Sequence, residues 1–266
     1  MGPEAFAAAG AWAPPWFAPW QATGLAVATR VAQGQALHDA LNAAGPDGPV
    51  RFVPQQALPA GMPYEQFIFE RRECPVRPGL HDFFNGLAWL HHPRTKLALN
   101  RLQAEAIARD GIGSRRGPVR DAITVFDENG AWLEAPAPLW AALRERQWHR
   151  LFVELRPLWA QARLHLLGHA LLEQLASPRK GLTAHVWCTP DAMNSGASSD
   201  AKRAAWCTAD TLAGKPFTPL PVLGLPGWWP GNENFSFYDD SHVFRPRRAP
   251  ETITTTTSAG LARRSS

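Results

Sequence analysis

The stretch Leu80–Gln103, with the sequence LHDFFNGLAWLHHPRTKLALNRLQ, has the clearest helical period in the chain. At about 100° per residue, its side chains separate into an apolar and a polar face. The apolar face holds Phe83, Leu87 and Leu90, with Phe84 at its edge. The opposite face holds His81, Asn85 and His92. Asp82 falls in the first turn, where a carboxylate meets the positive end of the helix dipole.

Proline at position 93 ends or kinks this helix, because it lacks an N–H group and clashes with the preceding turn. It can also take the first position of a second helix. On that helix Lys96, Asn100 and Gln103 share one side, spaced i, i+4, i+7. The two polar stripes could be solvated faces. Solvated faces usually hold Glu, Lys and Arg, however, whereas Asn and His are poorer helix formers. A ligand-binding role therefore stays open.

The length and amino-acid composition limit the classes of protein to which this chain can belong. The 266 residues can bury a large core, and the 25 prolines predict long irregular segments. A net charge of +4 with scattered Lys and Arg does not indicate a nucleic-acid site. No apolar run approaches the ~18 residues of a membrane span. Three cysteines without paired spacing suit a reducing cytoplasm, where we expect the protein to work.

We predict a single α+β domain over residues 16–248, mostly helical with a small antiparallel or mixed sheet. Residues 1–15 are expected to be a disordered leader and residues 249–266 a disordered tail. The predicted helices cover residues 25–44, 81–108 and 138–160. The predicted strands cover residues 121–126, 131–134 and 182–188.

Three segments carry further expectations. The Asn129-Gly130 pair between two β-rich runs predicts a hairpin over residues 121–134. Tyr64–Glu70 can form a strand or a helix. Arg163–Leu167 can be a strand that leads into a helix at Gly168, or the first part of one longer helix.

A second polar cluster follows Gly168. His169 and Glu173 lie four residues apart, on one helix face in either interpretation of that segment. Such a pair can share a divalent metal ion, or the carboxylate can orient the imidazole. The pair can equally be structural, because buried imidazoles are commonly bonded to backbone carbonyls. His185, in an apolar strand, is a further candidate metal ligand.

Several reaction classes find no sequence support. Gly-x-Ser-x-Gly, which marks a serine-hydrolase elbow, is absent. The glycine-rich nucleotide-binding motifs Gly-x-x-x-x-Gly-Lys-Ser/Thr and Gly-x-Gly-x-x-Gly are absent too.

The order of several blocks resembles a bacterial family of uncharacterised proteins, domain of unknown function 3025, over about Trp16 to Arg248. The blocks are HDFFN with WL at residues 81–90, Pro93 with Lys96 and Asn100, RDA to FDENG at 120–130, GHALLE at 168–173, and PVLG, YDD and VFR between 221 and 245. The His91-His92 pair departs from the family pattern. The resemblance implies no activity, cofactor or partner.

Two functions remain as expectations. The first is a hydrolase, with or without a metal ion, with candidate catalytic residues His81, Asp82, Asn85, Lys96, Asn100, His169 and Glu173. In that case His81, His169, Glu173 and His185 are the candidate metal ligands. The second is a non-catalytic binding or scaffold protein whose polar residues are structural. Convergence of these side chains on one open cleft would favour the enzyme.

Overall fold

Two helices joined end to end at Pro93 form the centre of the fold. The computed structural model describes residues 2–111, 117–188 and 200–247. Helix α4 covers Leu80–His91 and α5 covers Pro93–Asp110, so the predicted helical pair over 81–108 is confirmed. Their polar stripes are not solvated: Asn85, Lys96 and Asn100 are buried.

The predicted hairpin over residues 121–134 is wrong. Residues Pro118–Asn129 form helix α6, and only the second half, Gly130–Glu134, is a strand, β3. Proline at the first helical position and an apolar stripe at helical spacing favour α6, and Asn129-Gly130 ends it. The buried stripe consists of Ala122, Ile123 and Phe126.

The main sheet has four strands in the order β4-β3-β5-β6. Their bounds are Arg163–Leu166 for β4, Gly130–Glu134 for β3, Thr183–Cys188 for β5 and Phe217–Pro221 for β6. Strand β3 pairs antiparallel with β4 and parallel with β5, and β5 pairs antiparallel with β6. The expected α+β class and mixed sheet are therefore confirmed, including the strands predicted at 131–134 and 182–188.

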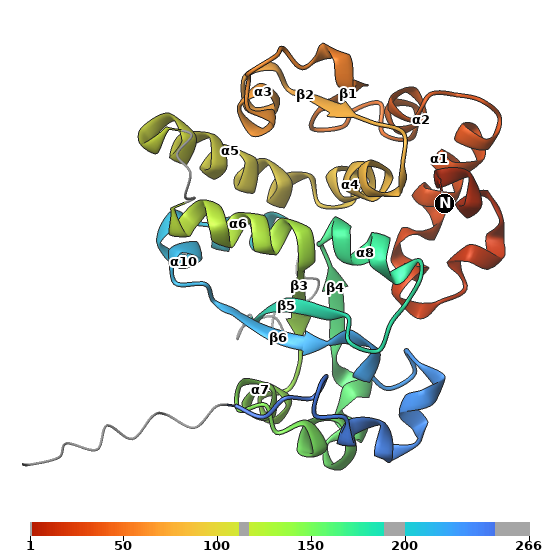
Figure 1. The fold of residues 1–266 in the computed structure, drawn as a ribbon, viewed down its shortest axis with the longest axis vertical. Helices are drawn as coiled ribbons and strands as arrows, with labels where there is room; N and C mark the ends of the chain where they lie inside the picture. Colours follow the sequence, from red (N-terminus) through yellow and green to blue (C-terminus); the bar gives the residue numbers. More distant parts are fainter. Residues whose placement is uncertain (1, 112–116, 189–199, 248–266) are drawn as a thin grey trace, which may run out of the picture.

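The elements stack in layers (Figure 1). Helices α6 and α8 (His169–Leu175) cover one face of the main sheet, and α4 and α5 lie above them. Helix α3 (Tyr64–Arg71) and the parallel pair β1 (Arg51–Pro54) and β2 (Glu73–Val76) form the outer layer. Helix α7 (Ala137–Arg144) lies at the other end of the sheet. The chain thus takes the helical alternative at 64–70, and the strand alternative at 163–167.

An aromatic cluster fixes α6 on the sheet. Phe126 packs edge-on against Trp132 of β3 and Trp187 of β5, with ring centroids 5.0 and 5.6 Å apart. It also stacks on Phe217 of β6 at 4.9 Å. Such aromatic pairs add stabilisation beyond the area they bury. The cluster therefore fixes the height and rotation of α6, whose opposite side faces α5.

The N-terminal segment differs from the expected disordered leader. Short 3-10 turns, Pro3–Ala7, Ala9–Trp12 and Pro15–Trp20, lay aromatic rings on the apolar face of α4. The ring of Phe6 lies 5.4 Å from that of Phe84, and both Phe6 and Trp12 are buried. Burial of large aromatic side chains outweighs the irregular backbone of this proline-rich segment.

Two predicted helices are interrupted. The segment 25–44 forms α1 (Gln21–Ala32) and α2 (Leu37–Ala44), because Gly34 between them has φ 91°. The segment 138–160 keeps only α7 as an α-helix. Arg146 then adopts φ 52°, and a π-helical turn and a 3-10 turn follow.

The remaining C-terminal part is partly helical. Helices α9 (Asp200–Trp206) and α10 (Ala209–Ala213) precede β6. The predicted tail, 249–266, lies outside the described residues. Among the residues that the structure does describe, no helix combines the length and apolar character that a membrane crossing needs.

Candidate functional site

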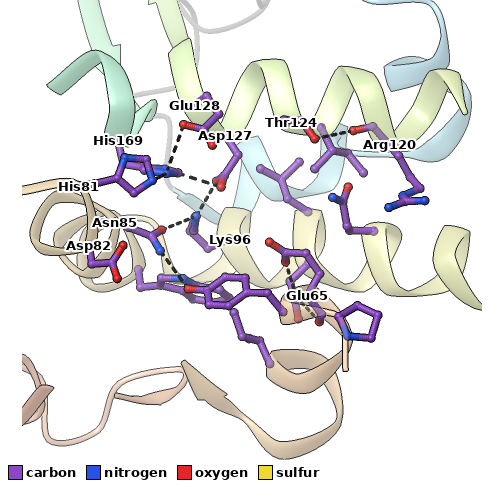
Figure 2. Close-up of a pocket in the computed structure, with 18 of the residues that line it drawn as sticks. Glu65, His81, Asp82, Asn85, Lys96, Arg120, Thr124, Asp127, Glu128 and His169 are labelled. Carbon is purple, nitrogen blue, oxygen red and sulfur yellow. Dashed lines mark hydrogen bonds and ion pairs between the residues drawn. The ribbon is translucent and has the colours of Figure 1, made fainter. Parts of the chain in front are cut away.

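A cavity of about 450 Å³ lies where α3, α4, α5, α6 and α8 meet (Figure 2). Most of its wall is polar, although it is built inside a helical core. The polar lining consists of Gln55, Tyr64, Glu65, Arg77, His81, Asp82, Asn85, Lys96, Asn100, Gln103, Arg120, Thr124, Asp127, Glu128 and His169. Helical spacing explains why so many polar side chains meet here, because each of α4, α5 and α6 turns one polar face toward the cavity.

Two histidines meet at one end of the cavity. The Nε2 atoms of His81, on α4, and His169, at the start of α8, lie 3.2 Å apart. The other nitrogen of His81, Nδ1, lies 3.0 Å from Oε2 of Glu173. A carboxylate only accepts hydrogen bonds, so His81 carries its proton on Nδ1 and turns the lone pair of Nε2 toward His169.

Two carboxylates of α6 complete this end of the cavity. Oε2 of Glu128 lies 3.5 Å from Nε2 of His169, and Oδ2 of Asp127 lies 3.7 Å from Nδ1 of the same ring. One ligand atom each from His81, Glu128 and His169 falls within 4.8 Å of the other two. Within the described part of the chain, this is the one such group of His, Cys, Asp or Glu side chains.

The protonation of these groups follows from burial and neighbouring charge. Burial lowers the pKa of His169 to about 4; Asp127 opposes that shift, and Lys96 adds to it. Burial and the charge of Asp127 raise the pKa of Glu128. The imidazole of His169 is therefore neutral near pH 7, which is the form that ligates metal ions.

An ion pair between a buried lysine and a partly buried aspartate lies beside the histidines. Nζ of Lys96 contacts Oδ1 of Asp127 at 2.5 Å and donates to Oδ1 of Asn85 at 3.0 Å. Burial alone would raise the pKa of Asp127, but the charges of Lys96 and His169 outweigh it and hold that pKa below its ordinary value. The lysine also lies over the Trp89 ring, 5.2 Å from its centroid. The ammonium is thus fixed within the cavity wall.

Hydrogen bonds within the protein also hold the side chains of the opposite wall. Asn100 donates to the backbone oxygen and to Oε2 of Glu65, at 2.8 and 2.7 Å. Burial raises the pKa of Glu65, and Asp127 adds to that shift. Asp82 accepts from the backbone N–H of Arg77 at 2.6 Å and from its guanidinium at 3.2 Å. Asp82 therefore anchors the loop before α4.

Close backbone approach brings His169 to α6. A Cβ atom at Gly168 would lie 2.5 Å from the Cα atom of Asn129 and 2.5 Å from the carbonyl oxygen of Glu128. Such a distance is too short for a side chain, so only glycine allows this contact. The N–H of Gly168 also donates to the carbonyl of Gly130 at 2.9 Å. The glycine before His169 therefore sets the distance between α8 and the carboxylates of α6.

The structure brings six of the seven candidate catalytic residues to the cavity wall: His81, Asp82, Asn85, Lys96, Asn100 and His169. Glu173 stands behind His81 rather than in the lining. His185 does not join them, because it lies in β5, beside Gly130 of β3 and Pro219 of β6. His92 faces a different, smaller cavity.

Sequence reasoning missed three of the four carboxylates in the cavity wall. The predicted hairpin puts Asp127 and Glu128 at a turn, and Glu65 falls in a segment for which strand and helix both stay open. The signal that could have found the first pair is the spacing of Arg120, Thr124 and Asp127, which share one face of a helix.

The fold and site together define a class: an α+β protein whose helical layers enclose a polar cavity with two histidines, four carboxylates and a buried lysine. The chain belongs to the family described as Protein of unknown function (DUF3025), whose model matches residues 50–248. No curated protein and no solved structure matches the chain significantly.

Proposed function

We propose that this protein is a metal-dependent hydrolase in which His81, His169 and Glu128 hold a divalent cation. The observation that carries the proposal is the convergence of two imidazole nitrogens and a carboxylate oxygen within 4.8 Å at one end of a cavity. Two nitrogens and one oxygen are the protein ligands of several catalytic zinc sites, in which a water or the substrate takes the fourth position.

The hydrogen bond behind one ligand supports a cation between the rings. Glu173 accepts from Nδ1 of neutral His81, which leaves the Nε2 lone pair of that ring facing His169. Without an ion, Nε2–H of His169 can donate to Nε2 of His81 at 3.2 Å, and a metal ion would replace that proton. Carboxylates behind metal-ligating imidazoles are a recurrent feature of metal sites. Glu128, as a third ligand, favours the metal ion over the proton.

The remaining side chains suit hydrolysis of a polar substrate. A cation held by three protein ligands lowers the pKa of a bound water toward 7 and polarises a carbonyl or phosphoryl oxygen. The Lys96 ammonium is fixed beside this position by Asp127 and Asn85, and it can stabilise negative charge that develops on the substrate. The cavity volume of about 450 Å³ accommodates a small molecule.

A second candidate, a non-catalytic binding protein, is favoured by one specific observation. Much of the wall is already paired within the protein, notably Asp82 with Arg77 and Asn100 with Glu65. We also infer a cytoplasmic setting, which is supported by three cysteines that form no disulfide.

The experiment that tests the proposal is metal analysis of the purified full chain, followed by zinc titration of the metal-free protein. One equivalent of metal is expected in the parent. His81→Ala, His169→Ala and Glu128→Gln should each lose it, whereas the exposed His149→Ala should not. Absence of binding by the folded parent would contradict the metal site. Stoichiometric binding without activity in a broad hydrolase screen would favour the binding protein.

A further inference from the structure

The cavity that contains the proposed metal centre continues along the space between α5 and α6 (Figure 2). His81, His169 and Glu128 lie at one end, whereas Arg120 and Thr124 lie toward the other. The side chain of Arg120 extends from α6 toward α5 and lines the same cavity. The chemistry of this far end therefore bears on which substrates the metal centre can accept.

Helix geometry gives the separation of the two ends. Arg120, Thr124 and Glu128 follow one another at i, i+4 and i+8 along α6, and all three line the cavity. At about 1.5 Å per residue, the Cα atoms of Arg120 and Glu128 are roughly 12 Å apart. Side chains on a helix tilt toward its N-terminus, so the guanidinium of Arg120 points further away from Glu128. A molecule that contacts both ends is therefore an extended one.

The charges in the cavity wall leave one cation unbalanced. Three cationic side chains line the cavity: Arg77, Lys96 and Arg120. The first two are paired, with Asp82 at 3.2 Å and with Asp127 at 2.5 Å. Among the described residues, no carboxylate lies within ion-pair distance of Arg120, which is only partly exposed. An anion on the occupant would balance this charge.

The guanidinium of Arg120 also has unused hydrogen-bond donors. It carries five N–H groups, and within the described part of the chain it makes one bond, from Nη1 to the carbonyl oxygen of Gly111 at 3.3 Å. The nearby carboxylate of Asp110 is held by Arg109 at 2.8 Å. Its pKa is lowered mainly by Arg109, and the charge of Arg120 adds a smaller effect. The planar fork of Arg120 therefore remains available for a bidentate anion.

A carboxylate suits this end better than a phosphate. A phosphate monoester carries a charge of about −1.5 to −2 at pH 7. The far end supplies the single positive charge of Arg120, and Glu65 of the opposite wall contributes a carboxyl group. A carboxylate carries one negative charge and matches the guanidinium in geometry.

We propose that Arg120 forms a carboxylate-binding subsite, and that the substrate is an extended molecule with a carboxylate at one end and the hydrolysed bond at the other. The position of that bond rests on the proposed function, because it lies at the cation held by His81, His169 and Glu128. The carboxylate subsite itself needs no metal ion. Arg120 thus selects the substrate and takes no part in breaking the bond.

The first experiment uses the zinc-loaded full chain and pairs of hydroxamates, which bind zinc through two oxygens. One member of each pair ends in a carboxylate, as in suberic acid monohydroxamate, and the other ends in a methyl group, as in octanohydroxamate. Over a series of chain lengths, calorimetry should show one at which the carboxylate compound binds about tenfold more tightly, equal to about 1.4 kcal/mol. Arg120→Gln should abolish this advantage. Arg101→Gln, which removes an exposed cation paired with Glu105, should retain it.

The second experiment uses the metal-free full chain, so its result does not depend on the metal centre. The ¹⁵N signal of the Arg120 side chain is followed during titration with acetate and with phosphate at constant ionic strength. Arg120→Lys assigns the signal, because it removes the guanidinium and keeps the positive charge. A saturable shift with acetate is expected.

The two experiments separate the subsite from the metal centre. Zinc uptake with equal affinity for both members of every hydroxamate pair would overturn the subsite and leave the metal centre intact. If the parent takes up no zinc, the proposed function fails, and a saturable acetate shift would still support the subsite. A saturable shift with phosphate and none with acetate would overturn the assignment to a carboxylate. No zinc uptake and no shift with either anion would overturn both proposals.

Discussion

Oε2 of Glu173 lies 3.0 Å from Nδ1 of His81, although the two residues are 92 positions apart in the chain. The contact fixes the ring with its lone pair toward His169. Glu173→Ala should therefore weaken zinc binding by about 10–100-fold, the usual effect of removing a carboxylate behind a ligating histidine. Both side chains are 39% exposed, so the melting temperature should change little.

Zinc competition with a chromophoric chelator measures the affinity of the Glu173→Ala variant for zinc. Glu105→Ala, an exposed carboxylate on α5, is the control, and equal affinity in both variants would contradict the assigned role.

Gly168→Ala should destabilise the protein and disturb the site together. The added methyl group meets the backbone of Glu128 and Asn129 at 2.5 Å, so α8 must move away from α6. Overpacking of this kind costs about 1–3 kcal/mol. Urea unfolding measures the free energy, and zinc titration measures the site. Gly181→Ala is the matched control, because its nearest neighbour would be a side-chain atom of Val243 at 3.7 Å. Similar stabilities for the Gly168→Ala and Gly181→Ala variants would show that α8 and α6 move apart without cost, which would contradict the prediction.

Lys96→Met should be strongly destabilising at neutral pH. It leaves the carboxylate of Asp127, which is only 20% exposed, without its cation, a loss of at most about 3–5 kcal/mol. The double variant Lys96→Met/Asp127→Asn should lose less than the sum of the single losses, because no unpaired charge remains. Lys215→Met breaks an exposed pair with Asp121 and should cost less than about 1 kcal/mol. Denaturant unfolding of the parent, Lys96→Met, Asp127→Asn, the double variant and Lys215→Met decides this. Equal costs for the two lysine variants would refute the argument from burial.

Acid should destabilise the protein through His92. Burial and Arg203 lower its folded-state pKa to about 3, against about 6.5 for an unfolded chain. The unfolded state then binds more protons below about pH 6.5. Stability is complete above that pH and falls by up to about 1.4 kcal/mol per unit as the pH drops toward 3. The neighbouring His91 and His165, whose pKa values burial also lowers, contribute in the same direction.

The His92 contribution is separated by a non-titrating variant. His92→Gln retains a donor for the carbonyl of Leu166, and its unfolding free energy should depend less steeply on pH than that of the parent. Unfolding is measured in the presence of a chelator, because metal binding is itself pH-dependent. Exposed His149→Gln is the control. Parallel pH profiles for parent and His92→Gln would rule out the assignment.

The polar faces of α4 and α5 could be predicted from sequence because helix geometry is local. The spacing of His81 and Asn85, or of Lys96 and Asn100, fixes which residues share a face whatever the helices pack against. The i, i+4 spacing of His169 and Glu173 was equally readable. It could not show that Glu173 stands behind His81, since that contact depends on how α8 packs on α4.

Helix α6, which forms one wall of the cavity, was not predicted because its sequence is locally ambiguous. Asn129-Gly130 serves equally as a hairpin turn and as a helix end, and β-branched residues around it favour the first choice. The aromatic contacts of Phe126 with the sheet decide for the helix, and these are tertiary. Because Asp127 and Glu128 are carried by that helix, an error in one element removed both carboxylates from the predicted site.

The aromatic N-terminal segment has a practical consequence for work on shorter fragments of this chain. The family model begins at residue 50, whereas the ring of Phe6 packs on Phe83 and Phe84 of α4, and Phe17 stacks on Phe84. A fragment cut at the family boundary would expose those rings to water and invite aggregation. It would also remove the packing that holds α4, the helix that carries His81, in position. Inactivity or poor solubility of such a fragment would then reflect the cut, not the chemistry of the cavity.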